Sequence, residues 1–296
     1  MLTLQQSFDK SLICRLAEQV VSEPVTSIKR LKGGAAYNYE VNRHIIFKLP
    51  RLQNTSREWQ LSAKCAPVIQ RYLPVKIPQM ILSQVSVPQE REPLFCCFYE
   101  KIAGHPISRN HFSQLSTAQK INFFEQLSAV ACLLHMIPIY LLPIRVPSHA
   151  ERRCPFNAGL LQSTKKMVSQ RILKSLDSPD ISDEKEVLCH TDLHSENLCI
   201  DRGNITGILD FELMSRGSSA LEFQPTFYQS SDLALWIDIY QSQSGCRLNK
   251  EKIMFTKRIS DLVYRTWSLF DPLNRPKRER RAMEIMLRRA WGRTRY

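Results

Sequence analysis

The chain has 296 residues, of which 43% are hydrophobic and 23% charged, and its formal net charge is +13 at pH 7. This composition excludes a disordered or fibrous chain and predicts a globular protein of one large domain or two lobes. The N-terminus lacks the basic and apolar regions of a secretory signal. The longest uncharged apolar stretch, residues 128–144, contains prolines and is shorter than the roughly 20 residues of a membrane helix. We therefore expect no transmembrane segment and a cytoplasmic location.

The first third is predicted to form strands around one helix. Apolar and β-branched runs predict the strands, and a cap cluster at Asn54–Ser56 predicts a helix over residues 56–72, where Trp59, Leu61 and Cys65 follow helical spacing. The strands are expected at residues 25–33, 37–42, 45–49, 77–87 and 94–102.

After Gly104 the pattern becomes mainly helical. Helices are expected at residues 116–136, 157–176, 231–242, 250–270 and 278–291. A β-rich first part followed by an α-rich second part is typical of a kinase. We therefore predict an α+β fold with two lobes, an N-terminal nucleotide-binding lobe over residues 1–102 and a C-terminal catalytic and substrate-binding lobe over residues 103–296.

The nine cysteines form no CxxC pair, and their number is odd. This pattern argues against a zinc ribbon or a dithiol redox site. Most of them lie in apolar stretches, so we interpret them as reduced core thiols.

Two short segments carry the residues that predict chemistry. Residues 190–197 read HTDLHSEN, and residues 208–212 read ILDFE. Phosphoryl transfer to an alcohol needs a carboxylate for the hydroxyl proton and oxygen ligands for Mg²⁺. Asp192 suits the first role, while Asn197 and Asp210 offer the hard oxygen donors that Mg²⁺ prefers. We expect His190 and His194 to orient the loop through hydrogen bonds rather than to bind a metal.

The HxDxxxxN pattern with a following [I/L]DxE element resembles the aminoglycoside phosphotransferases, a superfamily that includes choline and thiamine kinases and has a protein-kinase-like fold. The resemblance implies that Asp192 is the catalytic base and that Asn197 and Asp210 hold Mg²⁺. Phe211-Glu212 stands where protein kinases have Phe-Gly, which favours the small-molecule branch.

The resemblance extends into the first lobe. Gly33 and Gly34 match the family's phosphate-facing turn between the first two strands. Lys48 matches the lysine that contacts the α- and β-phosphates of ATP, and Glu58 matches the glutamate that pairs with it. The segment after residue 98 resembles the hinge, where backbone groups near Glu100 and Ile102 would meet adenine.

The acceptor cannot be read from the sequence. Most acceptors in the family bear amines, so acidic side chains are expected to receive them, with Glu196, Glu212 and Glu222 as candidates. The Ala220–Glu222 segment departs from the usual pattern and resembles thiamine-kinase-like members. The hypothesis is an ATP- and Mg²⁺-dependent phosphotransferase that acts on a hydroxyl of a choline- or thiamine-like metabolite or an aminoglycoside.

Two other classes of function stay open. One is a protein kinase, against which the missing Phe-Gly and Ala-Pro-Glu elements count. The other is a non-catalytic nucleotide- or RNA-binding module that uses the tail, since residues 275–296 contain nine basic and two acidic side chains. The favoured interpretation of this tail is a helix docked through Met283, Leu287 and Trp291, with its arginines in solvent.

Overall fold

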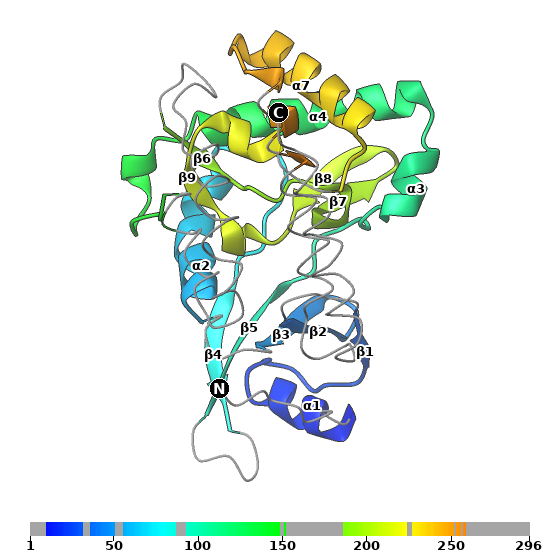
Figure 1. The fold of residues 1–296 in the computed structure, drawn as a ribbon. Helices are drawn as coiled ribbons and strands as arrows, with labels where there is room; N and C mark the ends of the chain where they lie inside the picture. Colours follow the sequence, from blue (N-terminus) through cyan, green and yellow to red (C-terminus); the bar gives the residue numbers. More distant parts are fainter. Residues whose placement is uncertain are drawn as a thin grey trace, which may run out of the picture.

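A computed structural model describes residues 10–31, 36–50, 56–86, 93–148, 151, 186–223, 227–251, 253–255 and 257–258. Within these residues a β-rich part is followed by a mainly helical part, which gives the predicted α+β architecture (Figure 1). The glycine turn at residues 33–34, the helices expected at residues 157–176 and 278–291, and the basic tail lie outside the described residues.

The first part contains a five-stranded antiparallel sheet with the strand order β1-β2-β3-β5-β4. Its strands are β1 (Ile28–Arg30), β2 (Ala36–Val41), β3 (Ile45–Pro50), β4 (Ile81–Val85) and β5 (Leu94–Glu100). All five fall within or beside the segments that the sequence predicts. β3 lies at the centre of the sheet and carries Lys48, which is opposite Asn38 on β2 and Cys97 on β5.

A tight turn sets the register of β2 and β3. Its central residues, Asn42 and Arg43, have φ values of 49° and 68°, as in the type I′ turns that match strand twist. The His44 N–H closes the turn by donating to the Val41 carbonyl at 3.2 Å.

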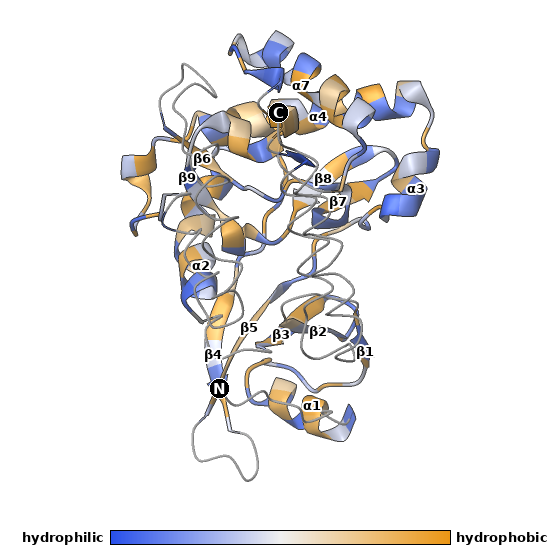
Figure 2. Ribbon diagram, in the orientation of Figure 1, coloured by the Kyte–Doolittle hydropathy of each residue, from blue (hydrophilic) through white to orange (hydrophobic). Residues whose placement is uncertain are grey.

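Two helices cover opposite faces of the sheet. α1 (Lys10–Glu18) packs Ile13 and Leu16 against one face, which includes Phe47 of β3. α2 (Ser56–Gln70) places Trp59 against the other face, which includes Ile46. Because alternate residues of a strand point to opposite faces, the apolar run of β3 serves both cores. Figure 2 shows the hydrophobic residues of the central strands between these layers.

The second part is built on α3 (Arg109–Gln114), α4 (Thr117–His135) and α7 (Ser230–Ser244). α4 begins with a capping box, since the Ser116 hydroxyl accepts from the Gln119 N–H and the Gln119 side chain accepts from the Ser116 N–H. α4 packs along α7 (Figure 1). Their shared core is rich in aromatic rings, such as Phe124 stacked on Trp236 at 6.0 Å.

Two small antiparallel pairs of strands lie between these helices and the large sheet. β6 (Val187–Cys189) pairs with β9 (Ser215–Gly217), and β7 (Leu198–Asp201) pairs with β8 (Asn204–Ile208). Short 3-10 helices complete this part: η2 (Ile139–Leu141) follows α4, and η5 (Ser195–Asn197), η6 (Phe211–Leu213) and η7 (Ser219–Phe223) lie beside the small strands in the chain. The chemistry-bearing segments of the sequence therefore lie in loops held by short strands.

Two close contacts join the β-rich and helical parts. The Lys76 N–H, in the segment between α2 and β4, donates to the Thr206 carbonyl at 2.9 Å. Gly104 follows β5 with φ 97°, and a Cβ at this position would lie 2.9 Å from the Ile200 backbone. The chain thus needs glycine where it enters the helical part.

No helix among the described residues is long and apolar enough to cross a membrane. The eight cysteines in these residues are free thiols, and five of them are buried. Cys154 lies outside the described residues.

Candidate active site

Asp192 lies in the loop between β6 and η5, and Asn197 ends η5 five residues later. The Asn197 Nδ2 group donates to the Asp192 Oδ2 atom at 2.9 Å and to its backbone carbonyl at 3.0 Å. Because the oxygen and nitrogen of an amide point in different directions, this contact turns the Asn197 Oδ1 atom away from Asp192. The contact therefore occupies the amide nitrogen of Asn197 and leaves its Oδ1 atom for another partner.

His190 connects the two motif segments. Its Nε2–H group donates to the Leu209 carbonyl at 2.7 Å, and its Nδ1 atom accepts from the Asp192 N–H at 3.2 Å. The carbonyl partner assigns the proton to Nε2. The ring therefore fixes the backbone of Asp192 relative to the residue that precedes Asp210.

His194 supports the same loop from the other side. Its Nδ1 atom accepts from the Glu196 N–H, and its Nε2 atom lies 3.4 Å from the Asp192 Oδ1 atom. The sequence predicted that both histidines orient the loop, and these hydrogen bonds confirm it. Asp192 itself keeps 37% of its side chain exposed, which leaves it accessible to an acceptor.

Asp210 follows β8 in the left-handed region, with φ 60° and ψ 50°. Lys48 reaches it from β3, with an Nζ–Oδ1 distance of 3.0 Å, and also contacts the Glu212 Oε1 atom at 2.5 Å. The Lys48 side chain is 6% exposed and the Glu212 side chain 14%, whereas that of Asp210 is 49% exposed. The sheet and the second motif thus meet at one cationic and two acidic groups.

The three groups shift one another's pKa values. Burial lowers the pKa of Lys48, but the charges of Asp210 and Glu212 outweigh this effect, so the pKa is raised well above its usual value. Burial would raise the pKa of Asp210, yet the charge and hydrogen bond of Lys48 hold it below its usual value. Burial and the Asp210 charge raise the pKa of Glu212. Lys48 therefore stays protonated and Asp210 ionised at neutral pH.

Glu58 does not make the ion pair that the sequence predicted. It lies in the first turn of α2, and its Oε2 atom is buried without a hydrogen-bond partner. Lys48 instead directs its ammonium group to Asp210 and Glu212. The two acids follow β8 in the chain, and their combined charge draws the lysine to that side.

The three acidic candidates for the acceptor occupy different surroundings. Glu196 is exposed and accepts from the Arg109 N–H at 3.4 Å. Glu212 is engaged with Lys48. Glu222 is fully buried, and its two oxygens accept backbone N–H groups of His190 and Thr191, so it has no surface to offer an acceptor. The structure therefore corrects the expectation for Glu222, because burial and hydrogen bonding already use this carboxylate.

The residues predicted to form the hinge lie at the end of β5 and directly after it. Glu100 ends β5 and is exposed, and the Lys101 N–H donates to the His44 carbonyl at 2.7 Å. Ile102 packs against Gly207 of β8, where a Cβ would lie 2.5 Å from the isoleucine Cγ2 atom. The predicted adenine contacts thus sit directly between the sheet and β8.

An open pocket lies beside the loop that carries Asp192, between α3 and the start of α7. Arg109, Phe227 and Asp232 are among its lining residues. The Phe227 ring stacks on His194 at 5.0 Å, so a single ring layer separates the pocket from the group beside Asp192. The sequence analysis missed Phe227, because nothing distinguishes it from the neighbouring core aromatics.

Comparison with known proteins identifies the class of protein that contains this site. A model of the phosphotransferase enzyme family matches residues 27–241. The chain is a phosphotransferase of the small-molecule kinase class. It belongs to the phosphotransferase enzyme family, as its motifs predicted. No curated protein matches the sequence.

Several solved structures share the fold. The GDP and kanamycin complex of APH(2")-IIIa has a TM-score of 0.71 at 16% identity, covering 97% of this chain and 100% of that one. The streptomycin–ATP–APH(2")-IIa complex has a TM-score of 0.62 at 14% identity, covering 88% and 89%. Macrolide 2'-phosphotransferase MphH from Brachybacterium faecium has a TM-score of 0.59 at 16% identity, covering 91% and 95%.

Proposed function

We propose that the protein transfers the γ-phosphoryl group of ATP to a hydroxyl of a small, amine-bearing molecule, in a Mg²⁺-dependent reaction. The observation that carries this proposal is the convergence of four motif residues from both parts of the fold. Asp192 contacts Asn197 at 2.9 Å, Lys48 contacts Asp210 at 3.0 Å, and His190 ties the two loops together. The nucleotide would lie between the N-terminal lobe, residues 1–102, and the C-terminal lobe, residues 103–296.

In this proposal Asp192 orients the acceptor hydroxyl and takes its proton. A carboxylate suits this role, because the proton leaves late in a loose phosphoryl-transfer transition state. Lys48 directs its charge toward the α- and β-phosphates, and its raised pKa keeps that charge in place. The exposed face of Asp210 and the Asn197 Oδ1 atom are the oxygen donors that would hold Mg²⁺.

The donor set fits this cation. It consists of one carboxylate and one amide oxygen, with no thiol or imidazole among the proposed ligands, which is the hard set that Mg²⁺ takes. When bound, Mg²⁺ neutralises charge on the phosphates. Gly33, Gly34, Glu100 and Ile102 stay proposed contacts to the nucleotide.

The acceptor would approach Asp192 from the side of the pocket lined by Phe227. Glu196 is the acidic residue of the original three that remains exposed for an amine. Kanamycin and streptomycin appear in the structures of similar fold, and both are amine-bearing alcohols, which supports this acceptor class.

The test is release of ADP from Mg-ATP against a panel of choline, ethanolamine, thiamine, amino-acid alcohols and aminoglycosides, with Asp192→Ala alongside. We expect acceptor-dependent ADP release that the variant loses while keeping its fold and nucleotide binding. Normal turnover by Asp192→Ala would sink the assignment. Silence across the panel with ATP binding intact would instead favour a protein acceptor or a binding role.

A further inference from the structure

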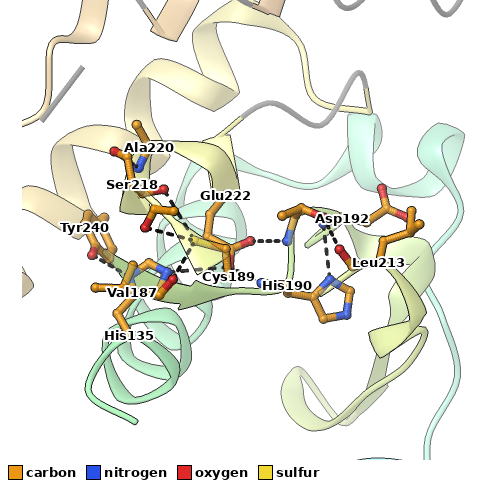
Figure 3. Close-up of polar contacts among 12 residues, drawn as sticks. His135, Val187, Cys189, His190, Asp192, Leu213, Ser218, Ala220, Glu222 and Tyr240 are labelled. Atoms are coloured by element: carbon orange, nitrogen blue, oxygen red, sulfur yellow. Dashed lines mark hydrogen bonds and ion pairs between the residues drawn. The ribbon is translucent and has the colours of Figure 1, made fainter. Parts of the chain in front are cut away.

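Glu222 is a buried acid placed behind the catalytic loop. It lies in η7 with no exposed surface. Its Oε1 atom accepts the His190 N–H, and its Oε2 atom accepts the Thr191 N–H at 2.9 Å. Figure 3 shows the carboxylate facing the start of the loop that carries Asp192. Charge-assisted hydrogen bonds of this kind are stronger than neutral ones, particularly where water is excluded.

The two N–H groups belong to the residues directly before Asp192. Thr191 has φ 69°, a left-handed conformation that β-branched residues rarely adopt. Its hydroxyl donates to the Leu213 carbonyl at 2.9 Å. The Glu222 carboxylate therefore stabilises a strained backbone that aims Asp192 into the site.

The same carboxylate also acts on the second motif. His190, whose N–H it accepts, donates through Nε2 to the Leu209 carbonyl, immediately before Asp210. A movement of His190 would therefore displace the backbone on both sides of the site. One buried group thus sets the spacing between Asp192 and Asp210.

His135 and Tyr240 stand behind Glu222. The His135 Nε2 atom lies 3.5 Å from the Glu222 Oε1 atom but makes no hydrogen bond, and its Nδ1 atom is 2.7 Å from the Tyr240 hydroxyl. These side chains come from the end of α4 and from α7. They place the imidazole edge against a carboxylate that is fully removed from water.

We propose that Glu222 is a positioning residue, which holds Asp192 and Asp210 in register through the backbone of residues 190–191, and that His135 and Tyr240 hold Glu222 in place. The kinetic consequence rests on the proposed function. The structural consequence is protection of two backbone amides from hydrogen exchange, and this consequence does not depend on the proposed function.

The test compares Glu222→Gln and Glu222→Asp with the parent protein. The glutamine is isosteric, but its amide nitrogen faces one of the two N–H groups, whereas the aspartate keeps the charge on a shorter side chain. We expect Glu222→Gln to speed hydrogen exchange in the peptide around residues 188–194 and to lower kcat on the order of 10²-fold, with KM for ATP little changed. Glu222→Asp should recover part of both effects.

Unchanged exchange at this peptide in Glu222→Gln would overturn the proposal, whether or not an acceptor has been found. An equal rise in KM and fall in kcat for every substrate, with exchange raised across the whole chain, would indicate general destabilisation and also overturn it. Tyr240→Phe keeps the buried ring and removes the hydroxyl that contacts His135. Tyr240→Phe should also speed exchange around residues 188–194 and lower kcat, both to a smaller extent than Glu222→Gln. It replaces Glu222→Gln in the test if that variant does not fold.

A bound metal is the competing explanation, because ligand atoms of His135, Cys189 and Glu222 all lie within 4.8 Å of one another. Cys189→Ser is the matched control. Its hydroxyl replaces the thiol that donates to the Ser218 carbonyl, and the two bonds from the loop to Glu222 remain. We expect this variant to match the parent in exchange and turnover. Stoichiometric zinc in the purified protein, lost in Cys189→Ser together with activity, would overturn the proposal.

Discussion

Replacing Lys48 by Met tests the charge cluster at the centre of the site. The change removes a cation that contacts Asp210 at 3.0 Å and Glu212 at 2.5 Å, and it leaves the acids facing each other without a counter-charge. Breaking a buried ion pair in this way costs about 3–5 kcal/mol of unfolding free energy. Solvent reaches half of the Asp210 side chain and screens its charge, so we expect the lower end, about 3 kcal/mol at pH 7.

The loss should depend on pH with a defined sign. Burial already raises the pKa of Glu212 in the folded protein, and removal of Lys48 raises it further. The folded variant then binds a proton more tightly than the unfolded chain, so its stability falls as pH rises through the folded pKa of Glu212. The deficit relative to the parent should therefore be largest at pH 7 and smaller near pH 5.

The assay is urea unfolding at both pH values for Lys48→Met, Glu212→Gln and the double variant. Because the double variant lacks the buried charge of Glu212, it should recover part of the loss. Lys101→Met is the matched control, since its ion pair with Glu40 lies at a partly exposed site and should be worth about 1 kcal/mol or less. The reasoning fails if Lys48→Met loses no more stability than Lys101→Met, or if its loss is the same at pH 7 and pH 5.

Three further expectations concern the cation, a glycine and the thiols. Asn197→Ala should raise the Mg²⁺ concentration for half-maximal activity at least ~10-fold, since it removes a proposed ligand, and a Mg²⁺ titration that superimposes on the parent would contradict this. Gly104→Ala should cost about 1–3 kcal/mol in urea unfolding, because φ is 97° and the new Cβ meets the Ile200 backbone; unchanged stability would contradict that strain. Burial raises the pKa of Cys65 to about 11 and of Cys96 to about 12. Alkylation at pH 8, mapped by mass spectrometry, should therefore spare both thiols until urea unfolds the chain. Rapid labelling of both thiols in the native protein would refute this expectation.

Local patterns were sufficient to predict most of the elements that carry the site. The apolar run of β3, the cap cluster before α2 and the apolar spacing of α4 are signals that act within a few residues, and the structure has these elements close to their predicted bounds. The contact between Asp192 and Asn197 is also local, because the two residues lie five positions apart in one short segment.

Contacts between distant segments were harder to predict. Lys48 pairs with Asp210 and Glu212, which lie more than 160 positions away, rather than with Glu58. An ion pair of this kind depends on how β8 and β3 approach each other, and residue spacing carries no such information.

The second expectation that the structure corrects concerns Glu222, which is buried. Glu222 was a candidate to receive the acceptor because most acceptors in the family bear amines. Its carboxylate accepts the backbone N–H groups of His190 and Thr191, which the tertiary fold buries and which therefore need an acceptor. A sequence shows side chains, whereas unpaired backbone donors appear only once the loop is folded.

The most direct test of the central claim is a single-turnover measurement with Mg-ATP and the acceptor that gives the fastest ADP release. Mass spectrometry would quantify ADP and phosphorylated acceptor in the same samples. The account predicts equal amounts of the two products from the parent protein and neither from Asp192→Ala. ADP without phosphorylated acceptor, or both products from Asp192→Ala at the parent rate, would contradict it.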